Sequence, residues 1–294
     1  MRGDLPETEL PSAAARDLDV METEGIVALL GREQTAAAAA VERVSPAIAA
    51  AVDAIVDRLR AGGALHYVGA GTSGRIATLD AAECPPTFGT PPELVVAHVA
   101  GGDEALVRAV EGAEDYADRG AERIRAAARC ADAVVGISAS GGAPFVVSAL
   151  RAARELGALT VAVTSVAASP LAAAAEHAIV VETGPEPIAG STRLKAGTAQ
   201  KLVLNAISTA TMIRLGRVYD NLMVDVVATN AKLEARALRL VVGLTGIAPD
   251  RAPELLAAAG GSVKVAVVMH RRRVDASEAG RLLERSGGFL RPVL

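Results

Sequence analysis

Five short apolar runs, separated by stretches of helical character, constrain the fold of this chain more than any other feature. A run of four to eight apolar residues bounded by turn residues is typical of a strand buried on both faces. Strands that alternate with helices at this spacing build a parallel sheet. We therefore predict an α/β fold with a doubly wound, five-stranded parallel sheet, whose strands lie at 64–70, 94–100, 133–138, 159–164 and 178–181.

Helical segments flank the predicted sheet on both sides. Residues 22–60 are rich in alanine and predict two helices, the second of which starts at Ser45-Pro46, with Ser45 as its cap. A long helix without proline is predicted after Gly190, and shorter helices follow from about residue 235. We divide the chain into an N-terminal helical segment (1–60), a sheet domain (61–240) and a small helical C-terminal subdomain (241–294).

Composition limits the classes of function. Lys and Arg total 30 against 34 Asp and Glu, which gives a net charge of −4, so the basic surface of a nucleic-acid-binding protein is not expected. Aromatic residues make up 2% of the chain and tryptophan is absent, which argues against a site that stacks bases or sugar rings. No histidine lies at metal-ligand spacing from a cysteine or an acid, so we expect neither a metal nor another cofactor.

The sequence also indicates a compartment. The N-terminal segment is acidic and polar, and no apolar run approaches the roughly 18 residues of a membrane helix. Cys84 and Cys130 alone cannot form a disulfide framework or a zinc site. We expect a cytoplasmic protein that binds neither nucleic acid nor membrane.

A glycine-rich loop, Gly69-Ala70-Gly71-Thr72-Ser73-Gly74, follows the first predicted strand with the spacing of a dinucleotide fingerprint. A dinucleotide site also needs an acidic residue at the end of the second strand, where this chain has His98 and two apolar residues. The two hydroxyls of the loop, at the start of a helix, suit a terminal phosphate instead, because free N–H groups and the helix dipole favour an anion.

Two further segments offer similar chemistry. The third strand ends in a Ser138–Gly142 loop, and the pair Ser191-Thr192 opens the predicted long helix. Ligands of open α/β sheets bind beyond the carboxyl ends of the strands, where the first two loops would converge. Any one of these serines is more often a helix cap than a ligand, but together they favour a phosphorylated small molecule. The predicted phosphate-binding residues are Gly71, Thr72, Ser73, Ser138, Ser140, Gly141, Ser191, Thr192 and Lys195.

Two glutamates belong to segments near this edge of the sheet. Glu83 precedes Pro85 and Pro86, which we expect to end the helix that follows the glycine loop. Glu114 lies on a helix predicted after the second strand. Most glutamates are solvated surface carboxylates, yet Glu83 stands in an otherwise apolar, proline-rich segment. Both interpretations, surface carboxylates and a proton-transfer pair, stay open on the residues alone.

Long strings of this sequence closely resemble the N-acetylmuramic acid 6-phosphate etherase family, within the sugar isomerase (SIS) superfamily. The resemblance implies an SIS fold, a homodimer, and a carbon–oxygen lyase of amino sugar catabolism and peptidoglycan recycling. Such an enzyme cleaves the lactyl ether of N-acetylmuramic acid 6-phosphate, which yields N-acetylglucosamine 6-phosphate and D-lactate. The strings are GAGTSGR (69–75), AECPPTFG (82–89), AGGDEAL (100–106), AVEGAED (109–115), GSTRLKAGTAQKLVLN (190–205) and NLMVDVVATNAKL (221–233).

The resemblance implies roles for both acids. The proton donor of the family falls on Glu83, and the second active-site carboxylate falls on Glu114. Elimination of lactate needs one group that takes the C2 proton and another that protonates the departing oxygen. We assign Glu83 as the donor and Glu114 as the base, an order that the sequence does not decide.

This chain departs from the family pattern at Ala82, where relatives commonly have a serine beside the donor glutamate, and in one loop. Relatives usually have SGRTPY where this chain has Ser140-Gly141-Gly142-Ala143-Pro144-Phe145, so Arg, Thr and Tyr side chains are replaced. This loop favours the alternative of a non-catalytic SIS regulator that binds a sugar phosphate, whereas retention of both acids favours the enzyme. A sugar-phosphate isomerase would share the scaffold but leave the second acid unexplained.

Overall fold

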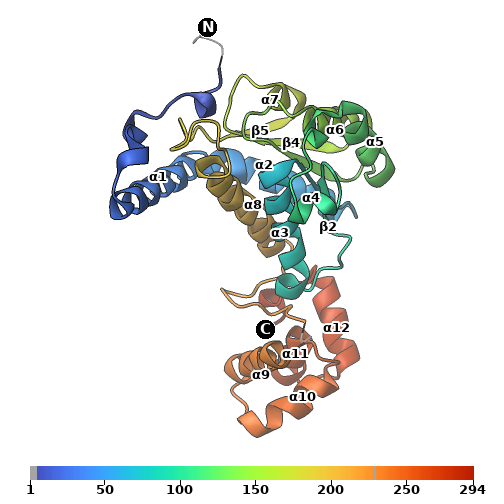
Figure 1. Ribbon diagram of the computed structural model, residues 1–294. Coiled ribbons are helices and arrows are strands. Elements are labelled where there is room, and N and C mark those ends of the chain that lie inside the picture. The colour runs from blue at the N-terminus through green and yellow to red at the C-terminus, as the bar shows by residue number, and fades with distance from the viewer. Residues whose placement is uncertain (1–4, 228–229) are drawn as a thin grey trace. The chain divides into compact units, whose positions relative to one another are not determined.

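A computed structural model describes residues 5–227 and 230–294 (Figure 1). The chain forms two compact units, and each unit combines segments that are distant in sequence. The first unit consists of Met1–Ala81 and Glu93–Ser208, and the second of Ala82–Pro92 and Thr209–Leu294. Helices α3 (Gly71–Phe88) and α8 (Lys195–Arg214) each contribute residues to both units.

The first unit is built on a five-stranded parallel sheet in the order β2-β1-β3-β4-β5. The five predicted strands are confirmed to within one residue at each end. Their apolar side chains explain this agreement, because the sheet buries nearly all of β1, β3 and β4. The strands are β1 (Leu65–Gly69), β2 (Val95–Val99), β3 (Ala133–Ile137), β4 (Leu159–Thr164) and β5 (His177–Val180).

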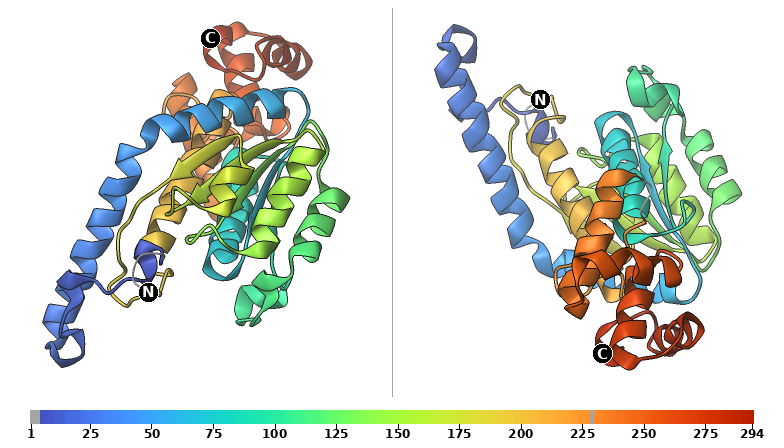
Figure 2. Two further views of the ribbon diagram at one scale, coloured as in Figure 1. Left: turned by 90° about the horizontal axis from the view of Figure 1, so that it is seen from above. Right: turned by 90° about the horizontal axis from the view of Figure 1, so that it is seen from below.

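Helices cover both faces of this sheet, as the predicted doubly wound fold requires (Figures 1 and 2). On one face, α2 (Ser45–Arg60) packs on β3, β4 and β5. Buried Asp80 of α3 accepts hydrogen bonds on the same face from Tyr67 of β1 and from Asn205 and Ser208 of α8. The other face carries α5 (Ala117–Ala127), α6 (Pro144–Glu155) and α7 (Pro170–Ala174), which enclose an apolar core with the strands.

The two predicted N-terminal helices are present as α1 (Thr23–Arg43) and α2. The predicted cap at Ser45 is wrong in detail. Ser45 is the first residue of α2, and its hydroxyl donates to the carbonyl of Glu42 at 2.7 Å. The α2 start relies on Pro46, whose fixed φ suits a first turn and whose missing N–H costs no helical bond there.

Two helix boundaries differ from the sequence prediction. Helix α3 does not end before Pro85 and Pro86 but continues to Phe88. The prolines deprive the carbonyls of Ala81 and Ala82 of their usual N–H partners. Burial of Cys84 and Phe88 favours continuation of the helix past the prolines. After β2, helix α4 is only four residues long and Glu114 lies instead on the short 3₁₀ helix η4; the bounds are α4 (Glu104–Val107) and η4 (Ala113–Asp115).

The second unit contains the predicted C-terminal helical subdomain, which has its own apolar core. This unit begins at Thr209 within α8 and also takes in 82–92, and the predicted boundary at 240/241 falls inside α9. Its helices are α9 (Ala231–Thr245), η5 (Pro249–Arg251), α10 (Ala252–Ala258), α11 (Val263–Arg272), α12 (Ala276–Arg285) and η6 (Arg291–Val293). The N-terminal segment adds the short helices η1 (Glu7–Glu9), η2 (Ala13–Ala15) and η3 (Leu18–Val20).

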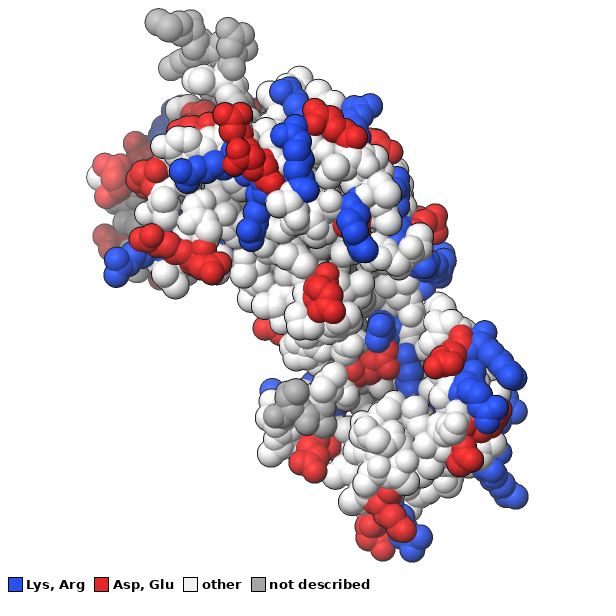
Figure 3. Space-filling model, turned by 90° about the vertical axis from the view of Figure 1, so that its right-hand side faces the viewer, with Lys and Arg blue, Asp and Glu red and all other residues white. Residues whose placement is uncertain are grey.

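The surface carries charges of both signs. On the face shown in Figure 3, basic and acidic side chains are interspersed, in line with the nearly balanced composition. Within residues 5–227 and 230–294, no single helix has the length and apolarity to cross a membrane, although the bent pair Pro249–Ala258 and Val263–Arg272 passes that test when taken together.

A chain of hydrogen bonds runs through the first unit from exposed Arg123 of α5 to three buried residues at β2, β1 and the start of β3. Arg123 Nε lies 3.1 Å from His98 Nδ1, His98 Nε2 lies 3.0 Å from His66 Nδ1, and His66 Nε2 lies 3.3 Å from Asp132. A guanidinium can only donate, so Nδ1 of His98 accepts and its proton is on Nε2. The Nε2–H of His98 then donates to Nδ1 of His66. The proton of His66 therefore lies on its Nε2, which faces the carboxylate of Asp132. We call these four residues the histidine relay.

Burial keeps both rings of the relay neutral. It lowers the pKa of His98 to about 4, and the charges of His66 and Arg123 act in the same direction. Burial also lowers the pKa of His66 and outweighs the neighbouring carboxylate of Asp132. A positive His98 could not accept from Arg123, so the neutral ring is the form that the relay needs.

We predict that this burial makes the stability of the first unit depend on pH. The unfolded chain binds a proton at His98 below its ordinary pKa of about 6.5, whereas the folded chain does so only near pH 4. The free energy of unfolding therefore falls as the pH drops from 6.5 to 4, by about 3 kcal/mol from this residue. Urea unfolding at several pH values measures how the free energy of unfolding depends on pH. Between pH 4 and 6.5, its slope against pH should be smaller in His98→Leu than in the parent chain by about 1.4 kcal/mol per pH unit. An unchanged slope would contradict the assignment.

Candidate active site

The carboxyl ends of three neighbouring strands bring the predicted loops together. Gly69, the last residue of β1, pairs in register with Val99 of β2 and Ile137 of β3. The N–H of Ala100 also donates to the carbonyl of Gly69 at 3.0 Å. The glycine-rich loop therefore lies between the loop that follows β2 and the Ser138–Gly142 loop, and the sequence had predicted that it converges with the second of these.

The glycine-rich loop leads directly into α3, whose first residue is Gly71. Ser73 is buried, and its hydroxyl donates to the side-chain oxygen of Gln200 on α8 at 2.9 Å. A side chain added at Gly197 of α8 would meet the methyl group of Thr72 at 3.4 Å. The loop is thus held against the first turns of α8, and the lone pairs of the Ser73 hydroxyl stay available as acceptors.

The Ser138–Gly142 loop is equally constrained. Ser138 is buried, and the hydroxyl of Ser140 accepts from the N–H of Gly142 at 3.3 Å. Gly141 has a φ of +67° and packs so closely against Ser169 that no side chain fits there. The Ser138–Gly142 loop contains no side chain larger than that of serine.

Two of the three residues within 140–145 that depart from the family pattern are apolar and buried. Ala143 and Phe145 are buried in the core formed with α5 and α6. Gly142 is exposed. The loop therefore carries no long polar side chain of its own beyond its serines.

The start of α8 already holds a carboxylate. Glu186 is fully buried and accepts from the backbone N–H groups of Lys195 at 2.8 Å and Ala196 at 2.9 Å. The ammonium of Lys195 is also buried, 2.6 Å from Glu33 and 3.1 Å from the carbonyl of Pro185. A phosphate at this helix end would have to displace one of these partners. The sequence analysis missed Glu186, which no local motif marks as a cap.

Ser191 and Thr192 lie in the turn before α8 and do not open the helix itself, which begins at Lys195. Their backbones are engaged locally, because Ser191 donates to Ile188 and the carbonyl of Thr192 accepts from Gly197. Their hydroxyls make no hydrogen bond within the part of the chain that the structure describes.

Glu114 lies beside the glycine-rich loop. It lines a cavity of about 160 Å³ together with Ala70, Gly71, Arg75 and Ala100. Its side chain is exposed. The structure thus brings a carboxylate to the entrance of the predicted phosphate loop, although Glu114 sits on a 3₁₀ turn and not on the predicted helix.

Glu83 belongs to the second unit, on the last turns of α3. Its side chain is exposed, whereas the next residue, Cys84, is buried. Gly89 then has a φ of +61° and touches the carbonyl of Asp225 so closely that a side chain cannot be accommodated. The turn that carries Glu83 is therefore followed by a close contact between Gly89 and Asp225, which both belong to the second unit.

Arg75, the last residue of the string GAGTSGR, holds the segment that leads to Glu114. Its Nε donates to the carbonyls of Ala105 at 2.9 Å and Leu106 at 3.2 Å, and its terminal nitrogen donates to Arg108 at 3.0 Å. These carbonyls end α4 and have no helical donors of their own. The sequence analysis missed this residue, since its partners are about thirty positions away.

The described residues contain no group of three or more potential metal ligands. The candidate site on the first unit is a set of backbone N–H groups and hydroxyls, with the carboxylate of Glu114, around the carboxyl ends of β1, β2 and β3. Such a set can bind an anion and transfer protons.

Two family models match this chain. One is described as "Glucokinase regulatory protein N-terminal SIS domain" and matches residues 47–154, and the other is described as "SIS domain" and matches residues 106–210. Among solved structures, a phosphoheptose isomerase from Neisseria gonorrhoeae has a TM-score of 0.50 and 22% identity, over 64% of this chain and 97% of its own. This likeness identifies the SIS fold.

Curated relatives are more similar. A protein from Symbiobacterium thermophilum is 56% identical over 86% of this chain and 84% of its own length. Another from Rubrobacter xylanophilus is 51% identical over 98% of this chain and 95% of its own. Both are named N-acetylmuramic acid 6-phosphate etherase.

Proposed function

Because this chain belongs to the N-acetylmuramic acid 6-phosphate etherase family, we propose that it cleaves the D-lactyl ether of N-acetylmuramic acid 6-phosphate. The products are N-acetylglucosamine 6-phosphate and D-lactate. Identity above 50% over most of both chains supports this activity, and so does the SIS fold.

The observation that carries the proposal is the cavity shared by Glu114 and Gly71. An enzyme of this kind must hold a phosphate and move a proton at a carbon only a few bonds away. The glycine-rich loop offers backbone N–H groups at a helix start for the phosphate, and Glu114 is a carboxylate in the lining of the same cavity, as is Glu111. A regulator that only binds a sugar phosphate has no need of a carboxylate that transfers protons.

We assign the phosphate to residues around the glycine-rich loop. Backbone N–H groups and hydroxyls there satisfy a dianion without a metal or a cofactor. Ser191, Thr192 and Lys195 are secondary members of the set, because Glu186 and Glu33 already occupy the start of α8 and the Lys195 ammonium. The primary members are Gly71, Thr72, Ser73, Ser138, Ser140 and Gly141.

Proton transfer by two glutamates completes the reaction. In the open-chain sugar the aldehyde acidifies the C2 proton, and Glu114 removes it. The C3–oxygen bond then breaks, and Glu83 protonates the oxygen of the departing lactate. Glu83 takes a proton from the water that adds to C3 of the unsaturated aldehyde, and the proton on Glu114 returns to C2, so that both glutamates regain their starting forms.

The test is D-lactate release from N-acetylmuramic acid 6-phosphate by the purified chain, followed with a D-lactate dehydrogenase. Lactate and N-acetylglucosamine 6-phosphate in equal amounts are expected. Binding of the sugar phosphate without lactate release would favour the alternative, a non-catalytic SIS regulator. An isomerised sugar phosphate in place of lactate would indicate the isomerase.

We predict that Arg75 positions the segment that carries Glu114. Arg75→Met leaves three carbonyls without their charged donor, and hydrogen bonds of this kind contribute roughly 1.5–3 kcal/mol each. We expect kcat for lactate release to fall by about 10- to 100-fold, with a smaller change in KM, since the phosphate loop is untouched. Arg75→Lys should recover part of the activity. An unchanged kcat in Arg75→Met would contradict this role.

Homodimer formation and a cytoplasmic location also remain predictions for this chain. Light scattering after size exclusion tests the first. A mass near twice 29.8 kDa is expected, and a monomer would contradict it.

A further inference from the structure

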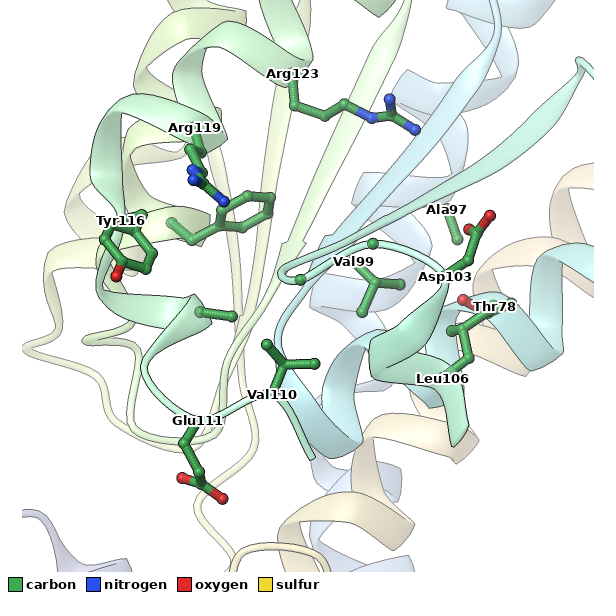
Figure 4. Close-up of a pocket in the computed structure, with 14 residues that line it drawn as sticks. Thr78, Ala97, Val99, Asp103, Leu106, Val110, Glu111, Tyr116, Arg119 and Arg123 are labelled. Carbon is green, nitrogen blue, oxygen red and sulfur yellow. The ribbon is translucent and has the colours of Figure 1, made fainter. Parts of the chain in front are cut away.

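A second pocket of the first unit lies at the free edge of the sheet, where β2 is the outermost strand. It has a volume of about 660 Å³, within the ordinary range for small-molecule sites. Ala97 and Val99 of β2 form part of its wall, and Arg119 and Arg123 of α5 form another part (Figure 4). The pocket contains none of the residues that we assign to catalysis or phosphate binding, and it shares Val110, Glu111 and Ala113 with the lining of the Glu114 cavity.

Arg123 presents its guanidinium in a fixed orientation. Its Nε is committed to His98, at the end of the histidine relay, while its four terminal N–H groups make no hydrogen bond with the described residues. A neutral ring is an unusual partner for a guanidinium, because it orients the group without cancelling its charge. The positive charge of Arg123 is therefore available at the pocket.

Arg119 lies one helical turn earlier and is also uncompensated. Its guanidinium stacks over the ring of Tyr116, 5.0 Å from the ring centre, and forms no ion pair with the residues that the structure describes. Arg119 and Arg123 are four positions apart on α5, but their guanidiniums point in different directions in Figure 4. The terminal N–H groups of Arg123 suit a carboxylate, which can accept two of them in parallel.

The pocket also contains acidic groups, which do not pair with these arginines. Asp103 and Glu111 line different sides of it, and the Glu111 side chain points away from the other labelled residues (Figure 4). Both are exposed and form no ion pair with described residues. A simple anion would leave these carboxylates unmatched. A ligand with a carboxylate at one end and an ammonium at the other can pair with Arg123 through the carboxylate and with Asp103 through the ammonium.

The edge strand adds backbone groups. The carbonyl of Leu94 and the N–H of Ala100 both bond to β1. Successive residues of a strand point their backbone groups to alternate sides, so the N–H and C=O of Ala97, an odd number of positions from both, point away from β1 at the free edge. An extended peptide can pair with such groups. Val99, Leu106 and Val110 supply apolar wall for an aliphatic side chain.

We propose that this pocket binds a short peptide zwitterion of dipeptide size. Its carboxylate is received by Arg123, its ammonium lies toward Asp103, and its amide pairs with Ala97. This is a binding function beyond the proposed ether cleavage.

Calorimetric titration of the full chain tests the proposal with glycyl-L-leucine as the probe. Its N-acetylated form lacks the ammonium and its C-terminal amide lacks the carboxylate, so each should bind at least tenfold more weakly. Arg123→Gln should weaken binding of the free dipeptide by about 10- to 100-fold. Arg125→Gln is the matched control, because Arg125 is on the same helix but pairs with Glu155 at 2.8 Å outside the pocket.

Loss of binding in Arg123→Gln, with binding kept in Arg125→Gln, would support the site. Equal binding of the N-acetylated form would overturn the assignment of a zwitterion. No binding of the free dipeptide at millimolar concentration, or equal losses in both variants, would overturn the site itself. Lactate release measured on the same preparation is independent of these outcomes, so a failure here is distinguishable from a failure of the proposed function.

Discussion

Glu83→Gln and Glu114→Gln are each expected to reduce D-lactate release by about 10²- to 10⁴-fold, the contribution of a positioned proton donor or acceptor. Glutamine has a side chain of the same size, but its amide group acts neither as a proton donor nor as a proton acceptor in the reaction. Both side chains are exposed, so the fold should survive, and circular dichroism and thermal unfolding should match those of the parent chain.

Isotope exchange separates the two roles. In deuterated water the base alone exchanges the C2 proton, even when lactate cannot leave. Glu83→Gln should therefore still incorporate deuterium at C2 of the substrate, whereas Glu114→Gln should not. The opposite pattern would reverse the assignment of donor and base. Glu93→Gln, at an exposed acid outside the Glu114 cavity, is the control and should keep near-normal turnover.

Lys264→Met is expected to destabilise the second unit by about 3–5 kcal/mol, the range found when one partner of a buried ion pair is removed. Lys264 is buried on α11 and its ammonium lies 2.6 Å from Asp225, 2.8 Å from the carbonyl of Gly216 and 2.9 Å from that of Gly288. Burial lowers the pKa of Lys264 and raises the pKa of Asp225, so each charge depends on the other.

Urea unfolding, with hydrogen exchange in α11 as a local probe, measures this loss. The double variant Lys264→Met with Asp225→Leu should recover part of the stability, since it removes both buried charges. Glu254→Gln breaks the exposed pair with Arg251 in the same unit and should change stability by less than about 1 kcal/mol. An equally small loss in Lys264→Met would show that the buried pair contributes little.

The parts of the fold that the sequence predicted are those with a local cause. Each strand is an apolar run bounded by turn residues, and the register of three strands then brings the glycine-rich loop and the Ser138–Gly142 loop together. The position of Glu114 beside Gly71 follows from the same geometry. The serines of these loops were singled out by their hydroxyls alone, and their role in binding stays a prediction.

The parts that the sequence did not predict depend on distant partners. Two prolines suggested a helix end before Phe88, yet packing of buried side chains in the second unit outweighs two missing helical hydrogen bonds. The cap of α8 comes from Glu186, nine residues before the helix starts, and the partner of Lys195 is Glu33. His66 and His98 were recognised as strand residues, but only the pairing of β1 with β2 reveals that they touch.

The passage of α3 into the second unit has a consequence for any attempt to shorten this protein. Residues 82–92 pack with the C-terminal helices, through the contact of Gly89 with Asp225, and Asp225 is in turn anchored by Lys264. A truncation after residue 208 would keep every strand and the glycine-rich loop but strip Glu83 of its surroundings. The C-terminal helices are thus scaffolding for the assigned proton donor, and a minimal version of the catalyst has to retain them.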